Sequence, residues 1–144
     1  MSLKIIHTAD WHLGQTFFGY DRDEEHEAFL SWLIDILTLR QTDVLLIAGD
    51  VFDVANPSAA AQRRFFRFLR EANRHNPQLQ IVIIAGNHDS AARLEAPIPL
   101  LEELNTSIVG VVPRTDLCKI DFDSLLIPLY NKEGKREAIC LAVP

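Results

Sequence analysis

Three short polar segments of the chain carry residue types that bind metal ions, and each directly follows an apolar run. They occupy residues 10–12, 49–53 and 86–89. Carboxylate, amide and imidazole donors together suit divalent ions such as Mn²⁺, Fe²⁺ or Zn²⁺ better than Ca²⁺. We therefore expect a metal centre whose ligands are Asp10, His12, Asp50 and Asn87.

Asp50 is the residue expected to join two metal ions. A carboxylate has two oxygens, so it can bridge ions that lie ~3.5–4 Å apart. Metal ions lower the pKa of water toward neutrality, and the resulting hydroxide can attack a phosphodiester. Two dications, offset by Asp10, Asp50 and the hydroxide, leave a net positive charge that suits a monoanionic substrate. The pattern predicts a metal-dependent phosphodiesterase.

Two residues of the third segment are expected to act in catalysis. His88 is predicted to face the substrate phosphate, where an imidazole can protonate the leaving oxygen or stabilise phosphoryl charge. Asp89 is predicted to hold the His88 ring in one orientation. Asp53, in the second segment, is expected to cap or brace its loop and not to bind metal.

The apolar pattern predicts an α/β fold that would bring the three polar segments together. Buried strands are expected at residues 4–9, 44–48 and 81–85, and helices at 23–39, 58–73 and 90–104. Further short strands are expected at residues 107–112, 117–122, 125–129 and 138–143. Ser58 should cap the second helix, and Pro97 and Pro99 should disturb the third. Because parallel strands share one carboxyl edge, ligands gather there.

Composition agrees with one globular domain. The chain has 144 residues, of which 48% are hydrophobic and 24% charged, so it can bury a core. A net charge of −6 does not by itself suggest a nucleic-acid binder, although bound cations would reverse the field at a site. No apolar run reaches the ~20 residues that span a bilayer, and no secretory pattern begins the chain. We expect a cytoplasmic protein.

Several other polar residues receive an ordinary structural interpretation. His7 is expected in the core or partly buried, and His26 and His75 in solvated helix positions. Cys118 and Cys140 are expected as free thiols in preference to a disulfide or a metal site. One row of arginines could follow a DNA backbone, but a solvated helix face is the preferred interpretation. The row comprises Arg63, Arg67, Arg70 and Arg74.

The polar segments and their flanking residues resemble a known family. Residues 7–14, 48–53 and 85–90 look like the first three phosphoesterase motifs of the SbcD nucleases, within the calcineurin-like metallophosphoesterase superfamily. The resemblance covers nearly the whole chain. Protein phosphatases of this superfamily usually have Arg-Gly after the second motif and Glu after Asn-His, and this chain has neither. That difference favours the nuclease branch.

The resemblance implies a fold, an activity and partners. The fold would be a four-layer α/β/β/α sandwich, and the activity Mn²⁺-dependent exonuclease and endonuclease cleavage of DNA ends and hairpins. The partners would be DNA, an SbcC-type ATPase subunit and a second copy of the chain. Asp10, His12 and Asp50 would serve mainly one ion, Asp50 and Asn87 the other, and His88 would be the catalytic histidine.

The sequence departs from that family after the third motif. The family has three further histidine ligands in later motifs, whereas no histidine follows His88 here. The chain also stops directly after an apolar run. We therefore expect residues 1–144 to be the N-terminal part of a metallophosphoesterase domain, with an incomplete sandwich and little or no activity alone. Residues 1–3 are expected to be a vector leader.

Two other functions remain open from the sequence. The first is a small-molecule phosphodiesterase or phosphatase with the same metal chemistry. The second is a protein-binding scaffold that has kept the fold and lost catalysis. The intact set of Asp10, Asp50, Asn87 and His88 argues against the scaffold.

Overall fold

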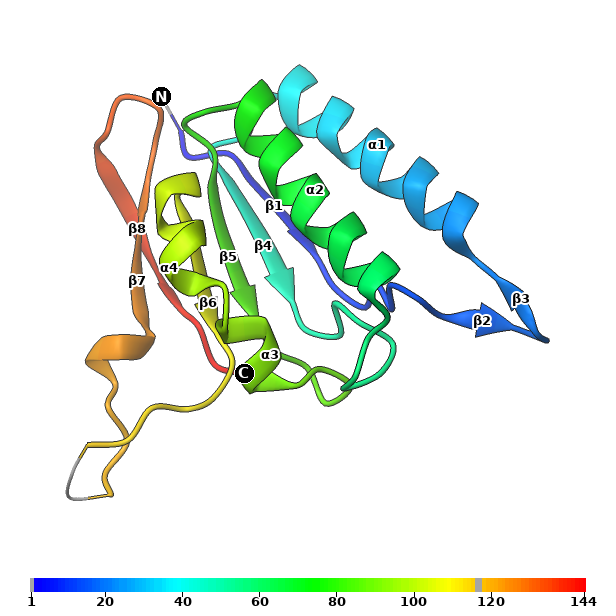
Figure 1. The fold of residues 1–144 in the computed structure, drawn as a ribbon. Helices are drawn as coiled ribbons and strands as arrows, with labels where there is room; N and C mark the ends of the chain where they lie inside the picture. Colours follow the sequence, from blue (N-terminus) through cyan, green and yellow to red (C-terminus); the bar gives the residue numbers. More distant parts are fainter. Residues whose placement is uncertain (1, 116–117) are drawn as a thin grey trace.

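A four-stranded parallel sheet forms the centre of the molecule (Figure 1). The computed structural model describes residues 2–115 and 118–144. In spatial order, the strands are β1 (Ile5–Thr8), β4 (Val44–Ala48), β5 (Gln80–Ile84) and β6 (Thr106–Val109). All neighbouring pairs run parallel, so the three polar segments leave the sheet at one edge. The strands predicted for these positions are confirmed, with ends that differ by at most three residues.

Helices follow the strands as the sequence predicts. They are α1 (Asp23–Leu39), α2 (Ala59–His75), α3 (Ala91–Glu95), α4 (Ile98–Leu101) and the 3₁₀ turn η1 (Glu102–Leu104). The Ser58 hydroxyl accepts a hydrogen bond from the Ala61 amide at 3.1 Å and so caps α2. The third predicted helix is broken where Pro97, which lacks an N–H, separates α3 from α4. None of the described helices is long and apolar enough to cross a membrane.

The sheet separates two apolar clusters, and the described chain forms three layers. Leu45 and Ile47 of β4 point into a core shared with the helices. Val44, on the alternate face of β4, packs against a hairpin formed by β7 (Leu126–Tyr130) and β8 (Arg136–Leu141), which follows the 3₁₀ turn η2 (Asp123–Leu125). The order helix, sheet, sheet corresponds to three of the four layers of the α/β/β/α sandwich (Figure 1).

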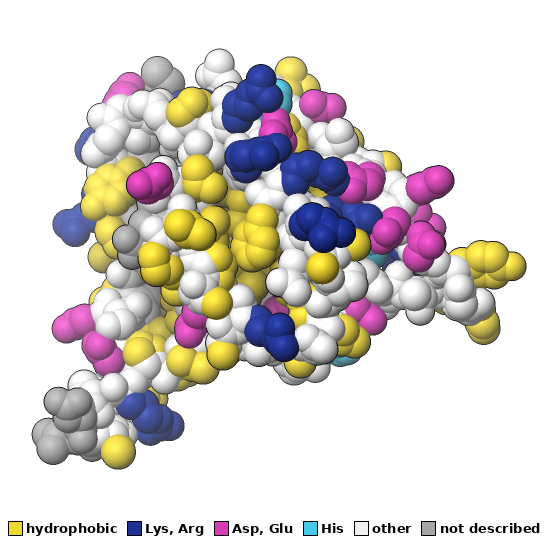
Figure 2. Space-filling view, in the orientation of Figure 1, with side chains coloured by type: hydrophobic (Ala, Val, Ile, Leu, Met, Phe, Trp, Pro, Cys, Tyr) yellow, Lys and Arg dark blue, Asp and Glu magenta, His cyan; other side chains and the backbone are white. Residues whose placement is uncertain are grey.

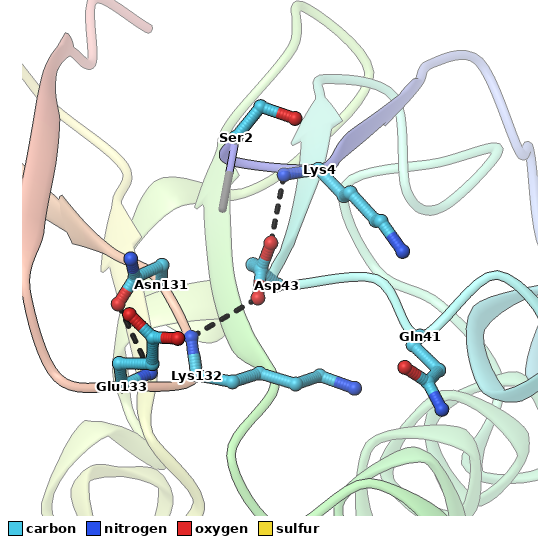
Figure 3. A pocket seen from close by; sticks show the side chains of 7 residues that line it. All are labelled: Ser2, Lys4, Gln41, Asp43, Asn131, Lys132 and Glu133. Atoms are coloured by element: carbon cyan, nitrogen blue, oxygen red, sulfur yellow. Dashed lines mark hydrogen bonds between the residues drawn. The ribbon is translucent and has the colours of Figure 1, made fainter.

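A buried carboxylate ties this hairpin to the start of the sheet. Asp43 is 5% exposed, and its two oxygens accept hydrogen bonds from the Lys4 amide at 2.7 Å and the Lys132 amide at 3.1 Å (Figure 3). The pocket in Figure 3 therefore lies at the N-terminal ends of β1 and β4. It is at the opposite edge of the sheet from the predicted metal ligands, and its polar groups attach the hairpin.

The first strand is less buried than its apolar sequence predicts. Ile5 is 43% exposed and His7 is also exposed, so the prediction that His7 is a core or partly buried histidine is wrong. The physical reason is the position of β1, which is an edge strand. The buried part of the second cluster comes from β4, β5, β6 and the hairpin segment, and β1 adds no buried residue to it.

The later strands are confirmed in part. The strands predicted at 125–129 and 138–143 correspond to β7 and β8, each shifted by one or two residues. The strand predicted at 117–122 begins outside the described residues. Its described part forms only an isolated bridge between Arg114 and Ile120. Cys118 and Cys140 are free thiols, as predicted.

Helix α2 has one basic exposed face. The four predicted arginines are exposed, and Figure 2 shows basic side chains gathered over this helix. A fifth arginine, Arg64, is only 8% exposed because it joins α2 to α1. Its guanidinium group lies 2.8 Å from the Asp23 carboxylate and 2.9 Å from the Glu27 carboxylate. Because its charge is paired within the protein, we do not expect Arg64 to bind DNA.

The first loop contains a small hairpin that the sequence did not predict. Strands β2 (Thr16–Phe17) and β3 (Tyr20–Asp21) are joined through Phe18 and Gly19, which both have positive φ. Two successive positive φ values are typical of a type I′ turn. Phe17, Phe18 and Tyr20 are 64%, 87% and 79% exposed, and the hairpin projects from the body of the molecule (Figure 1).

Candidate metal centre

The loops after β1 and β4 run side by side and continue the parallel pairing beyond the sheet. The amide of Asp10 donates to the Gly49 carbonyl at 3.1 Å, and the amide of His12 donates to the Asp50 carbonyl at 3.0 Å. The Leu13 amide then donates to the Val51 carbonyl at 2.9 Å. Backbone groups therefore fix the spacing of the two ligand-bearing loops.

The loop after β5 reaches the same place because two glycines remove side-chain bulk. A Cβ on Gly49 would lie 3.0 Å from the Gly86 Cα, and a Cβ on Gly86 would overlap the side chain and the amide of Asp50. The approach lets the His88 amide donate to Asp50 Oδ1 at 2.9 Å. Gly49 also has a φ of 86°, which glycine adopts readily.

Three predicted ligands have an uncommon backbone conformation. The φ angles are 56° at Asp10, 46° at His12 and 48° at Asp50. Such left-handed residues other than glycine are uncommon, although Asp, Asn and His tolerate the region best. Each costs on the order of 1–3 kcal/mol and persists where the surrounding structure imposes it, often at functional sites. Here the inter-loop hydrogen bonds impose it.

The side chains of these three residues converge. His12 Nε2 lies 3.9 Å from Asp10 Oδ1 and 4.0 Å from Asp50 Oδ2. Because a metal–ligand bond is ~2.1 Å long, ligand atoms of one ion lie up to ~4.2 Å apart. The donor set therefore fits a divalent cation. None of the ion pairs among the described residues gives Asp10, Asp50 or Asp53 a lysine or arginine partner, which also favours a cation at this place.

Asp53 lies behind the two histidines. Its Oδ1 is 3.3 Å from His12 Nδ1, and its backbone carbonyl is 2.7 Å from His88 Nδ1. The His12 and His88 rings meet edge to face, with their centroids 4.9 Å apart. A carboxylate behind a ligand imidazole can orient the ring. The predicted bracing of the loop by Asp53 stays a prediction, since His12, Asp53 and His88 also place ligand atoms close enough together to hold a metal ion.

His88 is exposed, and its environment favours the protonated ring. The hydrogen bond to the Asp53 carbonyl is the main cause that raises the pKa of His88 above its usual value. Desolvation, the next largest cause, lowers the pKa, and the carboxylates of Asp50, Asp53 and Asp89 raise it. Asn87 is also exposed, on the turn between Gly86 and His88 that contacts Asp50.

Asp89 has a different position from the one predicted. Its carboxylate accepts hydrogen bonds from three amides, those of Val51 at 3.1 Å, Phe52 at 2.9 Å and Gly86 at 2.9 Å. The His88 ring is held by the Asp53 carbonyl, so the prediction that Asp89 orients that ring is wrong. Spacing along the chain suggested the neighbouring residue, whereas the fold brings the loop after β4 closer. Asp89 clamps two loops together.

Replacement of Asp89 should weaken this clamp. We expect Asp89→Ala to lower the free energy of unfolding by about 3 kcal/mol, because three amides lose a charged acceptor. Asp89→Asn should cost less, since one oxygen remains. Urea denaturation of the variants measures both. Asp121→Ala is the matched control, because the Asp121 carboxylate accepts its hydrogen bonds from Ser124 of its own turn. Equal losses for Asp89→Ala and Asp121→Ala would contradict the clamp.

Sequence reasoning missed three polar residues beside the centre. Gln15 donates to Asp53 Oδ1 at 3.2 Å, and Arg22 donates to Gln15 Oε1 at 2.7 Å. His26, predicted to be solvated, is 5% exposed, whereas His75 is exposed as predicted. For Gln15, the sequence offered one signal, its closeness to the first motif. For His26 it offered none, because the burial of His26 depends on how α1 packs against the loop after β1.

The chain is similar to known proteins over most of its length. The family model described as calcineurin-like phosphoesterase matches residues 3–136. Proteins named as the SbcD component of the nuclease SbcCD are similar to the chain, and the one from Rhodobacter capsulatus is 49% identical over 99% of this chain and 35% of its own length. Those from Escherichia coli K12 and Bacillus subtilis are 38% and 39% identical, over 83% and 85% of this chain and 33% and 31% of theirs. The chain thus spans about one third of these relatives.

Proposed function

The chain belongs to the calcineurin-like phosphoesterase family, and we propose that its protein is a DNA nuclease of the SbcD type. The observation that carries the proposal is the position of Asp50 between two neighbouring loops. Its Oδ2 lies near His12, and its Oδ1 accepts the His88 amide. The names of the similar bacterial proteins support a nuclease over a small-molecule phosphoesterase. Residues 1–144 would form the N-terminal part of the nuclease domain.

Four residues would hold the metal ions. Asp10, His12 and Asp50 would bind one ion, and Asp50 with Asn87 would contribute to a second. Mn²⁺ suits this mixture of oxygen and nitrogen donors. When bound, such ions supply charge stabilisation and lower the pKa of water near the phosphodiester. The left-handed backbone at Asp10, His12 and Asp50 supports the assignment, since it aims these side chains before any ion arrives.

His88 would act directly on the substrate. Its Nδ1 faces the Asp53 carbonyl, which leaves Nε2 for a phosphoryl or leaving oxygen. A proton on Nε2 can stabilise a phosphoryl oxygen or neutralise the leaving oxygen. Asp89 would be a positioning residue that holds the loops of Asp50 and His88 together.

The names of the relatives also bear on partners. Each is one subunit of a nuclease, so we propose that this protein likewise acts with a second subunit, an ATPase of the SbcC type. We further propose that it acts on DNA ends and hairpins as a homodimer in the cytoplasm. DNA would approach the edge of the sheet where β1, β4 and β5 end.

Hydrolysis assays on the full-length protein test the proposed activity. With Mn²⁺, it should degrade linear duplex DNA from its ends and open a DNA hairpin, and EDTA should stop both reactions. Bis(4-nitrophenyl) phosphate serves as the control substrate for the metal chemistry. Hydrolysis of that compound without any cleavage of DNA would instead favour a small-molecule phosphodiesterase. If the protein hydrolyses neither DNA nor the nitrophenyl compound, the result would favour the non-catalytic scaffold.

The 144-residue chain should bind metal incompletely. It offers Asp10, His12, Asp50 and Asn87, but no histidine follows His88 to complete the ligands of the second ion. Calorimetric titration with Mn²⁺ should therefore give at most one tight site per chain. Asp10→Ala provides the control that removes a ligand. Two tight sites in the unaltered chain would contradict the assignment and would also remove the reason to expect an inactive fragment.

A further inference from the structure

A cleft with a volume of about 310 Å³ lies along the N-terminal end of α1, beside the candidate metal centre. Asp10 and His12 form one end of it, and Arg22, His26 and Phe29 line its wall. Whatever fills the cleft therefore lies next to the metal ligands. Its volume is near the lower end of the ~300–1,000 Å³ that is typical of small-molecule sites.

His26 is an unusual residue for the wall of such a cleft. It is 5% exposed, and neither ring nitrogen has a hydrogen-bond partner among the described residues. Burial is the main cause that lowers the pKa of His26. The charges of Arg22 and Arg64 lower it further, against the opposing charges of Asp23 and Glu25, and the lowered pKa favours the neutral ring. A neutral imidazole carries one donor and one acceptor. An unsatisfied buried polar group is costly, so a ligand gains affinity when the ring turns toward the cleft and one of its enclosed nitrogens pairs with that ligand.

The rest of the wall is both aromatic and polar. Phe29 and Trp11 meet edge to face with their centroids 5.6 Å apart, and they give the cleft an apolar surface. Arg22 is held by Gln15 at 2.7 Å and by Glu25 at 2.5 Å. Gln15 in turn contacts Asp53, whose carboxylate lies behind His12. A chain of contacts thus connects the cleft wall to the metal centre.

We propose that this cleft binds the nucleobase and sugar of the nucleotide whose phosphodiester is cleaved, with His26 as a hydrogen-bonding specificity residue. The proposal rests on the proposed phosphodiesterase function. A group bound there would be covalently attached to the phosphate at Asp10 and His12. A nucleobase has a flat apolar face for the Phe29 side and donors and acceptors on its edge for the imidazole.

Steady-state kinetics of the full-length protein with Mn²⁺ test the proposal. The dinucleotide thymidylyl-(3′→5′)-thymidine presents bases, whereas bis(4-nitrophenyl) phosphate presents none. His26→Phe keeps a ring but removes both nitrogens, and should raise the KM for the dinucleotide about tenfold, the effect of one lost buried hydrogen bond. This rise in KM for the dinucleotide should be at least five times the rise in KM for the nitrophenyl ester. The matched control is His75→Phe, an exposed histidine at the end of α2.

Two outcomes would overturn the proposal. An equal rise in KM for both substrates would mean that His26 only supports the fold of the site. An unchanged KM for the dinucleotide would mean that the base does not reach the cleft. Saturation-transfer NMR can detect binding of thymidine to the protein in the absence of metal. That measurement needs no catalysis, so it separates this inference from the proposed nuclease activity. The unaltered protein should bind thymidine and His26→Phe should bind it more weakly. A protein that cleaves DNA but shows no thymidine signal would refute the cleft and leave the nuclease.

Discussion

Replacement of Asp50 by asparagine is expected to lower kcat for phosphodiester hydrolysis about 10³-fold. The side chain is 13% exposed and lies between the loops of His12 and His88. Asparagine keeps an oxygen that can accept the His88 amide, so the loop connection at 2.9 Å survives. What disappears is the negative charge and one strong metal ligand. A loss of ~4 kcal/mol in transition-state stabilisation, which is reasonable for a displaced metal ion, gives that factor.

Two comparisons make the Asp50 result specific. Asp50→Ala removes the hydrogen bond as well, so it should lose stability in urea denaturation while Asp50→Asn loses little. Asp53→Asn should lower kcat by only about 10–100-fold, because Asp53 contacts the His12 ring from behind. Calorimetric Mn²⁺ affinity of the full-length protein provides the second measurement. Tight Mn²⁺ binding and near-normal kcat in Asp50→Asn would remove Asp50 from the metal site.

Replacement of Gly86 by alanine should have the largest effect of any single methyl group at this site. The added Cβ would overlap the Asp50 side chain and amide, and neither can move away easily. The Asp50 carboxylate accepts the His88 amide, and its loop is hydrogen bonded to Asp89 and to the loop after β1. Overpacking of a well-fitted contact costs about 3 kcal/mol. We expect a comparable loss of unfolding free energy, together with loss of Mn²⁺ binding.

Gly134→Ala is the matched control for that experiment. Gly134 has a φ of 74° in the β7–β8 turn, and a Cβ added there would meet no atom within 4 Å. The control therefore measures backbone strain without a clash, which costs about 1 kcal/mol. Urea denaturation and Mn²⁺ calorimetry of both variants give the comparison. If Gly86→Ala is no worse than Gly134→Ala and still binds Mn²⁺, the loops approach less closely than the structure shows.

The sequence predicted the framework of the site because its signals are local. An unbroken apolar run at residues 44–48 indicates a strand covered on both faces, and Ser58 marks the start of α2 through a cap that needs only its own neighbours. The order of strands and helices then implies parallel pairing and one shared edge. For this reason, the sequence alone could predict that Asp10, His12 and Asp50 lie close together.

The contacts that the sequence did not predict all depend on how distant segments meet. His26 is buried because the start of α1 packs beside the loop after β1, and His7 is exposed because β1 has, among the described residues, a neighbouring strand on one side only. Asp89 bonds to amides 37 and 38 positions away and not to the adjacent histidine. No periodicity or spacing along the chain records such meetings, so residue type alone gave the wrong environment for each of the three.

The left-handed backbone at Asp10, His12 and Asp50 has a consequence for how the site can be altered by evolution or engineering. Main-chain hydrogen bonds between the loops set that conformation, so a different side chain at the same position would point in the same direction. The conformation, however, admits few residue types besides glycine, and the best tolerated are aspartate, asparagine and histidine. These are donors of oxygen or nitrogen. The repertoire of exchangeable ligands is thereby confined to variants that still coordinate cations, and a redesign of metal preference should draw on the same three amino acids.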